Sequence, residues 1–270
     1  MQPENAIEVR DLTKKFKVYM DKGSQLKERV LFRKRNRYEE RWVLNGISFN
    51  VRKGEAVGLI GHNGCGKSTT LKLLTKIMYP DGGSITVDGK PIGAETKKIV
   101  SFLPERTYLR PTQTVASVLE YFSLFYEDFD VSAAEKMLNV LGVNKKAELK
   151  TLSKGTKEKV QLIAVMARRA RLYLLDEPIG GVDPAAREFI IETILSRFKS
   201  GATIVVSTHL IRDVEEILDE YVFVRGCRLG EPGSAKEVHE SGRTIDEIFR
   251  EEFRYSRPDA GRCENVFEDF

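Results

Sequence analysis

The sequence predicts an α/β fold with a mostly parallel central sheet, an antiparallel β subdomain and an inserted helical subdomain. Short runs that are apolar throughout, at residues 56–60, 172–175 and 203–206, are typical of parallel strands covered on both faces. Strand-like segments precede the first run, and apolar residues recur with helical spacing across residues 112–170. At 270 residues the chain is long enough to bury a main core and a subdomain.

The amino-terminal part predicts two strands separated by a charged segment. Residues 7–18 and residues 42–51 have the pattern of strands in an antiparallel layer. Residues 21–41, an insertion between them, are dense in Lys and Arg. Charge runs of this kind are usually solvated loops, and a basic helix near a membrane surface or a partner is the alternative.

A strand, a glycine-rich loop and a helix come next. The apolar run Ala56–Ile60 stops at Gly61, and residues 67–78 then have the spacing of an amphipathic helix. Residues 84–88 with the glycine that follows predict a short hairpin. The helical subdomain is expected at about residues 110–170, before the chain returns to the central sheet.

Within that subdomain, helical spacing is clearest in three stretches. They cover residues 115–125, 133–141 and 157–170. The sequence therefore predicts three helices inserted into the α/β core.

Composition favours a cytosolic protein. Charged residues make up 31% of the chain, and no run approaches the roughly 18 apolar residues of a membrane-spanning helix. The first residues lack the apolar core of a signal peptide. Cys65, Cys227 and Cys263 are odd in number and not spaced like metal ligands, which favours a reducing compartment without disulfides. The net charge of +4 is too small to indicate nucleic-acid binding by itself.

Residues 61–68 match the phosphate-binding pattern G-x-x-x-x-G-K-[ST] in the strand-to-helix context that it requires. The glycines let successive backbone N–H groups point at phosphates, and the positive end of the helix dipole adds to them. Lys67 would bridge the terminal phosphates, and Ser68 would hold Mg²⁺. A merely glycine-rich turn is the alternative. The expected nucleotide-binding residues here are Gly61, His62, Asn63, Gly64, Cys65, Gly66, Lys67, Ser68 and Thr69.

Two carboxylates, Asp176 and Glu177, follow the apolar run at residues 172–175. Ligands of open α/β sheets bind at this end of the strands. Asp176 suits a metal ligand, and Glu177 suits a catalytic residue that positions the attacking water. Alone, the pair fits a solvated strand end equally well, but beside a phosphate loop it predicts phosphoryl transfer.

A third motif identifies a family. Residues 152–156 read Leu-Ser-Lys-Gly-Thr and resemble the L-S-G-G-Q signature of the ATPase cassettes of ABC transporters. Ser153 and Gly155 match this signature, whereas Lys154 and Thr156 depart from it. Because the three motifs also follow one another in the family's order, Ser153 and Gly155 are expected to bind nucleotide.

The resemblance covers roughly residues 7–240 and implies a P-loop NTPase core. An ATPase domain is expected over residues 1–240, with residues 241–270 as a short tail. By resemblance, Asp183 belongs to the family's aspartate loop at the nucleotide. His209, after the strand-like run ending at residue 206, resembles the catalytic switch histidine.

Two further site residues come from the resemblance. The family usually has Gln at the position of Glu105, and a carboxylate can ligate Mg²⁺ but cannot donate the hydrogen bonds of an amide. Adenine in this family stacks on an aromatic residue before the phosphate loop. Phe16 is the first choice for that residue, and Tyr19, Tyr38 and Trp42 are alternatives.

The resemblance implies an ATP-binding and ATP-hydrolysing subunit that uses ATP and Mg²⁺ and energises export through separate transmembrane permease subunits. It would lie in the cytoplasm, on the inner face of the cell membrane. A homodimer, or a pair with a second cassette, would sandwich ATP head to tail, each phosphate loop facing the other copy's Ser153 and Gly155. The first part of the chain resembles cassettes of polysaccharide and teichoic-acid exporters, and the part from about Ile85 resembles those of bacterial drug, antibiotic or peptide exporters.

The rival class is a translation-associated or DNA-repair ABC protein that acts on nucleic acid. Such proteins usually carry twin cassettes, long coiled coils or zinc modules. This sequence has one phosphate loop, no sustained heptads and no cysteine cluster. No nucleic-acid partner is therefore expected.

Overall fold

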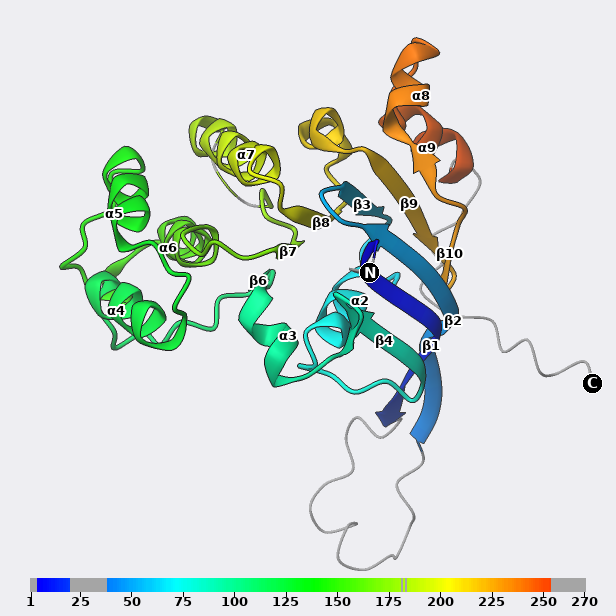
Figure 1. Ribbon diagram of the computed structural model, residues 1–270, viewed down its shortest axis with the longest axis horizontal. Helices are drawn as coiled ribbons and strands as arrows, with labels where there is room; N and C mark the ends of the chain where they lie inside the picture. Colours follow the sequence, from blue (N-terminus) through cyan, green and yellow to red (C-terminus); the bar gives the residue numbers. More distant parts are fainter. Residues whose placement is uncertain (1–3, 20–37, 181, 183, 254–270) are drawn as a thin grey trace, which may run out of the picture.

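The computed structural model describes residues 4–19, 38–180, 182 and 184–253. They form an antiparallel sheet, a mostly parallel sheet and a group of helices set apart from the antiparallel sheet (Figure 1). The predicted fold class is confirmed.

The antiparallel sheet packs its apolar face onto the rest of the molecule. Buried residues alternate along its second strand at Ile47, Phe49 and Val51, as expected for a sheet with one covered face. The predicted hairpin is present, with Val87 paired to Lys90. In the order β2-β1-β4-β5, the strands are β1 (Asn5–Tyr19), β2 (Tyr38–Arg52), β4 (Gly82–Val87) and β5 (Lys90–Pro91).

The second strand starts earlier than the sequence predicts. It begins at Tyr38 rather than Trp42, so the last residues of the expected charged loop belong to β2. Cross-strand contacts explain the extension, because the Lys15 ammonium lies 2.5 Å from a carboxylate oxygen of Glu40. The remainder of that charged insertion, residues 21–37, lies outside the described residues.

The mostly parallel sheet is buried in its centre. Every residue of β3, β7 and β8 is buried, which explains their uninterrupted apolar sequences. Because β3, β7 and β8 run parallel, their carboxyl ends meet at one edge. In the order β10-β9-β3-β8-β7-β6, with β11 beside β9, the strands are β3 (Ala56–Ile60), β6 (Val100–Leu103), β7 (Leu172–Asp176), β8 (Thr203–Thr208), β9 (Glu220–Arg225), β10 (Arg228–Leu229) and β11 (Gly233–Ser234).

Separate cores form on the two faces of this sheet. On one face, side chains such as Leu59 and Val205 pack with α2 (Lys67–Leu74) and the antiparallel sheet. On the other, Tyr173 and Val206 pack with the helices that cover this face. These helices are α6 (Lys154–Met166), α7 (Pro184–Lys199), α8 (Ala235–Glu240) and α9 (Ile245–Phe253).

A third core holds the helices between β6 and β7 together. Val118 of α4, Leu138 of α5 and Ile163 of α6 belong to it. Because Leu162 and Met166 of α6 belong to the core beneath the sheet, α6 joins the two cores. Figure 1 shows α4 and α5 on the side of the molecule away from the antiparallel sheet. The remaining helices are α3 (Ala94–Ile99), α4 (Val115–Phe125), α5 (Val131–Val140) and the 3₁₀ helices η1 (Leu149–Thr151), η2 (Ile211–Asp213) and η3 (Glu215–Ile217).

Several helix boundaries differ from the predicted ones, and two of these differences have a visible local cause. The helix after the phosphate loop ends at Leu74 rather than at residue 78, since Lys76 has a left-handed φ of 56° that no α-helix continues through. The third helix of the inserted group begins at Lys154 rather than at residue 157. Here the Ser153 side chain caps the helix by accepting a hydrogen bond from the Thr156 amide.

Cys65 is a free cysteine, as composition predicts. Cys263 lies outside the described residues. Among the described helices, none combines the length and the apolar character that crossing a membrane requires.

Candidate functional site

The phosphate loop, residues 61–68, connects β3 to α2 and is closely confined. A Cβ atom at Gly61 would lie 2.6 Å from the Val224 carbonyl oxygen. Gly66 has a φ of +113°, and its Cβ would lie 2.9 Å from the Val43 carbonyl oxygen, so both positions require glycine. No side chain caps the start of α2. Its first amides are thus available to an anion.

The Lys67 side chain lies across this loop. It is 5% exposed, and its ammonium donates to the carbonyl of Gly61 at 2.7 Å and to that of His62 at 3.3 Å. It also lies 3.5 Å from Glu177 Oε1. Lys67 therefore joins the phosphate loop to the carboxylate that follows β7.

Asp176, at the end of β7, has one satisfied and one unsatisfied oxygen. Its Oδ1 accepts hydrogen bonds from Ser68 Oγ at 2.9 Å and from Ser207 Oγ at 2.5 Å. Its Oδ2 is buried and has no hydrogen-bond partner among the described residues. A buried carboxylate oxygen without a donor, beside a serine hydroxyl, fits the oxygen ligands that Mg²⁺ prefers.

Glu177 is held by the end of the neighbouring strand. Its Oε2 lies 2.9 Å from His209 Nδ1, and the Thr208 hydroxyl donates to the same oxygen at 3.3 Å. The residue has a left-handed φ of 50°, a conformation that costs free energy for a residue with a side chain. This backbone therefore holds the carboxylate in place at a local cost, as happens at functional sites.

A cavity of about 920 Å³ adjoins these groups. Lys154, from the start of α6, also lines it. The cavity therefore brings together the phosphate loop, the end of β7, the end of β8 and the segment after β6. The predicted site residues that line it are Asn63, Gly64, Gly66, Lys67, Ser68, Thr69, Glu105, Glu177 and His209.

The other predicted residues of the loop and of β7 lie around this cavity. His62 packs its ring against α9. Cys65 is half-buried, and burial raises the pKa of its thiol. Asp176 lines a smaller adjoining cavity with Glu105 and Glu177.

Of the signature motif, residues 152–156, only Lys154 lines the cavity of the same chain among the described residues. Ser153 is exposed, and neither it nor Gly155 is among the lining residues. Space is open around Gly155, where a Cβ atom would meet nothing within 4 Å. Asp183, the remaining predicted nucleotide contact, lies outside the described residues.

Phe16, the first choice for adenine stacking, lies on β1 opposite Arg41 of β2. It is half-buried, and the Lys14 ammonium lies 5.5 Å from the centre of its ring. From this part of the molecule, Val43 lines the cavity. Neither Phe16 nor Trp42 is among the described residues that do so.

Sequence reasoning missed several neighbours of the site. Ser207 and Thr208 hold the two carboxylates, and Glu158 lines the cavity. Burial raises the pKa of the Glu158 carboxyl, one oxygen of which has no hydrogen-bond partner among the described residues. The serine and threonine end the strand that precedes His209, so their place beside Asp176 follows once β8 is paired with β7.

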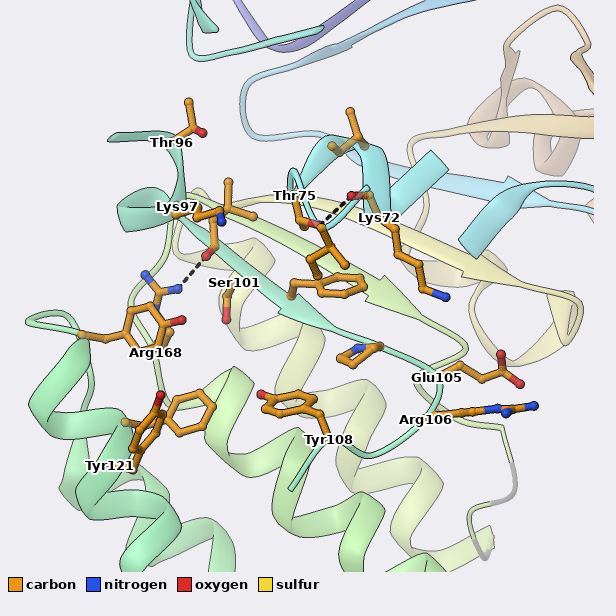
Figure 2. A pocket seen from close by; sticks show the side chains of 17 residues that line it. Lys72, Thr75, Thr96, Lys97, Ser101, Glu105, Arg106, Tyr108, Tyr121 and Arg168 are labelled. Carbon is orange, nitrogen blue, oxygen red and sulfur yellow. Dashed lines mark hydrogen bonds between the residues drawn. The ribbon is translucent and has the colours of Figure 1, made fainter. Parts of the chain in front are cut away.

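A second cavity, of about 740 Å³, lies on the other side of the segment after β6. Glu105 and Arg106 line both cavities. Figure 2 shows these two residues at one end of the second cavity, and Tyr121 and Arg168 at the other. The segment after β6 is therefore a shared wall between the site and a groove that reaches the helical elements.

Comparisons with known proteins agree with this geometry. The family described as ABC transporter matches residues 44–180. Nod factor export ATP-binding protein I of Burkholderia orbicola (strain AU 1054) is 33% identical over 224 residues, which cover 79% of this chain and 73% of that protein. Linearmycin resistance ATP-binding protein LnrL of Bacillus subtilis (strain 168) is 33% identical over 190 residues, which cover 67% of this chain and 61% of that protein.

Solved structures share the fold. A structure described as the ATP-binding subunit of an ABC transporter superposes with a TM-score of 0.73 at 27% identity, covering 91% of this chain and 98% of that one. A cassette in a dimeric post-hydrolysis state with ADP and Pi has a TM-score of 0.70 at 18% identity, covering 85% and 98%. The chain belongs to the ABC transporter family, as an ATP-binding cassette that hydrolyses ATP with Mg²⁺.

Proposed function

We propose that this chain energises export through separate transmembrane subunits and works at the inner face of the cell membrane. The observation that carries the proposal is the meeting of Lys67, Asp176 and Glu177 beside one cavity, where phosphate, metal and water-positioning groups are all needed. A relative named for Nod factor export favours export as the direction.

In this proposal the loop and its helix hold the phosphates. Backbone amides of residues 61–69 donate to phosphate oxygens, and the Lys67 ammonium leaves its carbonyl partners for the terminal phosphates. Ser68 Oγ and the free oxygen of Asp176 would hold Mg²⁺, which would neutralise charge on the phosphate oxygens. Glu105, which lines the same cavity, would be a further metal ligand.

Glu177 has the catalytic role. Its carboxylate orients the attacking water and accepts a proton from it. His209 and Thr208 hold the same carboxylate oxygen, so they set its direction. Because His209 lies on the loop after β8, movement of that loop releases or restores the carboxylate's position.

Two cassettes complete each other's sites. Ser153 is exposed at the start of α6 and does not line the ATP cavity of its own chain. We place Ser153 and Gly155 on the γ-phosphate held by a second cassette, where main-chain N–H groups stabilise charge. By the family resemblance, we assign Asp183 to contact with the nucleotide and Phe16 to stacking on adenine.

The second cavity is the proposed contact with the transmembrane subunits. Phe125 of α4 is 66% exposed and packs its ring on that of Tyr121, which lines this cavity. The segment of Glu105 and Arg106 borders this groove and the ATP cavity, so a partner seated here senses events at the phosphates.

The test is phosphate release by the purified chain with MgATP. Glu177→Gln keeps the side chain's size and removes its charge, so ATP still binds and turnover falls by at least about 100-fold. Glu240→Gln, an exposed change on α8, leaves turnover unaltered. If Glu177→Gln hydrolyses ATP at the wild-type rate, Glu177 is not the catalytic base.

A further inference from the structure

The carboxyl-terminal helix α9 contacts the phosphate loop. The His62 ring centre lies 5.2 Å from that of Phe249 and 5.1 Å from that of Phe253. The two Phe rings stack on each other at 4.3 Å and are each at least nine-tenths buried. We call this pair the α9 platform. One loop residue therefore rests on a surface supplied by the far end of the described chain.

The platform is firmly placed. Arg212 Nε donates to Asp246 of α9 at 2.7 Å, and the Ile245 amide donates to Glu215 Oε2 at 3.0 Å. Both platform rings also pack against Phe223 of β9, with ring centres 5.5 and 5.9 Å away. Because these interactions fix α9 to the central sheet and to the segment after His209, the platform is a rigid support.

The supported residue is part of the Lys67 arrangement. The His62 carbonyl accepts a hydrogen bond from the Lys67 ammonium, as does the carbonyl of Gly61. The position of the His62 ring therefore constrains backbone groups that hold the cation of the site. Gly61 in turn abuts the Val224 carbonyl of β9, so the start of the loop is confined from two sides.

We propose that His62 is a positioning residue, whose ring packing on the α9 platform keeps the phosphate loop in its nucleotide-binding shape. The proposal rests on the proposed role of Lys67. Without the His62 ring on the platform, part of the binding free energy goes to ordering the loop. Removal of the ring therefore weakens nucleotide binding more than it slows the chemical step.

The first experiment measures MgATP affinity and steady-state kinetics. His62→Ala raises Kd and KM by about 2-fold to 12-fold, the effect of removing one aromatic pair, and leaves kcat within about 2-fold. His62→Phe restores both values because it keeps an aromatic ring on the platform. His239→Ala, an exposed histidine on α8, leaves them unchanged.

The second experiment needs no nucleotide. Hydrogen exchange of the amides of residues 61–68 should be faster in His62→Ala and in Phe253→Leu than in wild type, with unchanged exchange in the strands of the central sheet. Phe253→Leu keeps an apolar side chain, so thermal unfolding of this variant checks that the fold persists.

Unchanged affinity and unchanged loop exchange in His62→Ala would overturn the inference, as would a loss of kcat at constant Kd. The outcome for the proposed function is separate. If wild type releases no phosphate from MgATP, the proposed function fails. If wild type turns over normally and His62→Ala equals it in every measurement, only the role of His62 fails.

Discussion

At the scale of single residues, the site depends on charged and polar side chains that contact one another directly. Lys67 lies 3.5 Å from Glu177, and Glu177 lies 2.9 Å from His209. The proposed phosphate-binding cation and the proposed base are thus neighbours. A change at either one alters the surroundings of the other, so binding and turnover must be measured separately for each variant.

The first prediction concerns Lys67. Lys67→Ala should weaken MgATP binding by at least about tenfold, since a hydrogen bond to a charged group contributes roughly 1.5–3 kcal/mol. Isothermal titration measures this. Lys72→Ala, in the same helix but outside the residues that line the ATP cavity, should bind as wild type does. Equal affinities for the two variants would refute the assignment of the phosphate loop.

Functional residues could be predicted from the sequence where they lie together in one short motif. Lys67 and Ser68 belong to one short motif, and Asp176 and Glu177 to another. Ser207, whose hydroxyl donates to Asp176, was not predictable in this way. Its place depends on the pairing of two strands separated by a helix, and a serine at a strand end has no distinctive spacing.

At the scale of elements, Arg168 ties the inserted helices to the central sheet. It follows α6, is 2% exposed, and its guanidinium donates to both carboxylate oxygens of Asp128. It also donates to the carbonyls of Lys98 and Val100 and lies 3.8 Å from the ring centre of Tyr126. One planar, buried cation therefore joins α3, β6 and the segment after α4.

The second prediction follows from this arrangement. Arg168→Leu should lower the free energy of unfolding by about 3–5 kcal/mol, because Asp128 and two carbonyls lose their donor. Chemical denaturation measures the change. Arg169→Ala is the matched control, since the neighbouring arginine is 71% exposed and pairs with Asp130 at the surface. A stability loss in Arg169→Ala as large as that in Arg168→Leu would contradict the argument.

Elements with regular patterns were predicted well, and their ends less well. The helix Val115–Phe125 has the bounds that its apolar spacing predicts. The early start of β2 at Tyr38 was not predictable, because charged residues stabilise a strand only where a partner comes within reach, as Lys15 of β1 does for Glu40. Helix ends likewise depend on local backbone choices, such as the left-handed Lys76.

At the scale of the whole molecule, the segment after β6 separates the ATP cavity from the second cavity. Glu105 and Arg106 line both, and α4 exposes Tyr121 at the second one. We propose that the transmembrane subunits bind in this groove. The same segment, with Glu105 and Arg106, would then contact both the nucleotide and the partner, so that partner binding and ATP turnover affect each other.

The third prediction tests that surface. Phe125→Glu should abolish co-purification of the chain with its transmembrane subunits from detergent extracts and leave MgATP affinity unchanged. Val140→Glu is the matched control, because Val140 is equally exposed, at 66%, but lies on α5, none of whose described residues lines the second cavity, whereas Phe125 packs on Tyr121, which does. Loss of co-purification in both variants, or in neither, would remove the groove from the proposal.

Packing across the whole molecule was the least predictable feature from sequence. The motifs predict which segments of the chain form the site, and the apolar runs predict the strands of the parallel sheet. The packing of His62 on Phe249 and Phe253 joins segments far apart in the chain. No spacing within one segment predicts such a long-range contact. From the sequence alone, the two phenylalanines are equally consistent with side chains that only pack in a hydrophobic core.

The measurement that tests the account most directly is the mass of Glu177→Gln with and without ATP, by size exclusion with light scattering. If two cassettes close on ATP and hydrolysis separates them, this variant should form more ATP-dependent dimer than wild type. Adding Ser153→Arg should reverse the effect by filling the partner's phosphate site. A variant that binds ATP without hydrolysing it, yet stays monomeric at every protein concentration, would contradict the head-to-tail sandwich.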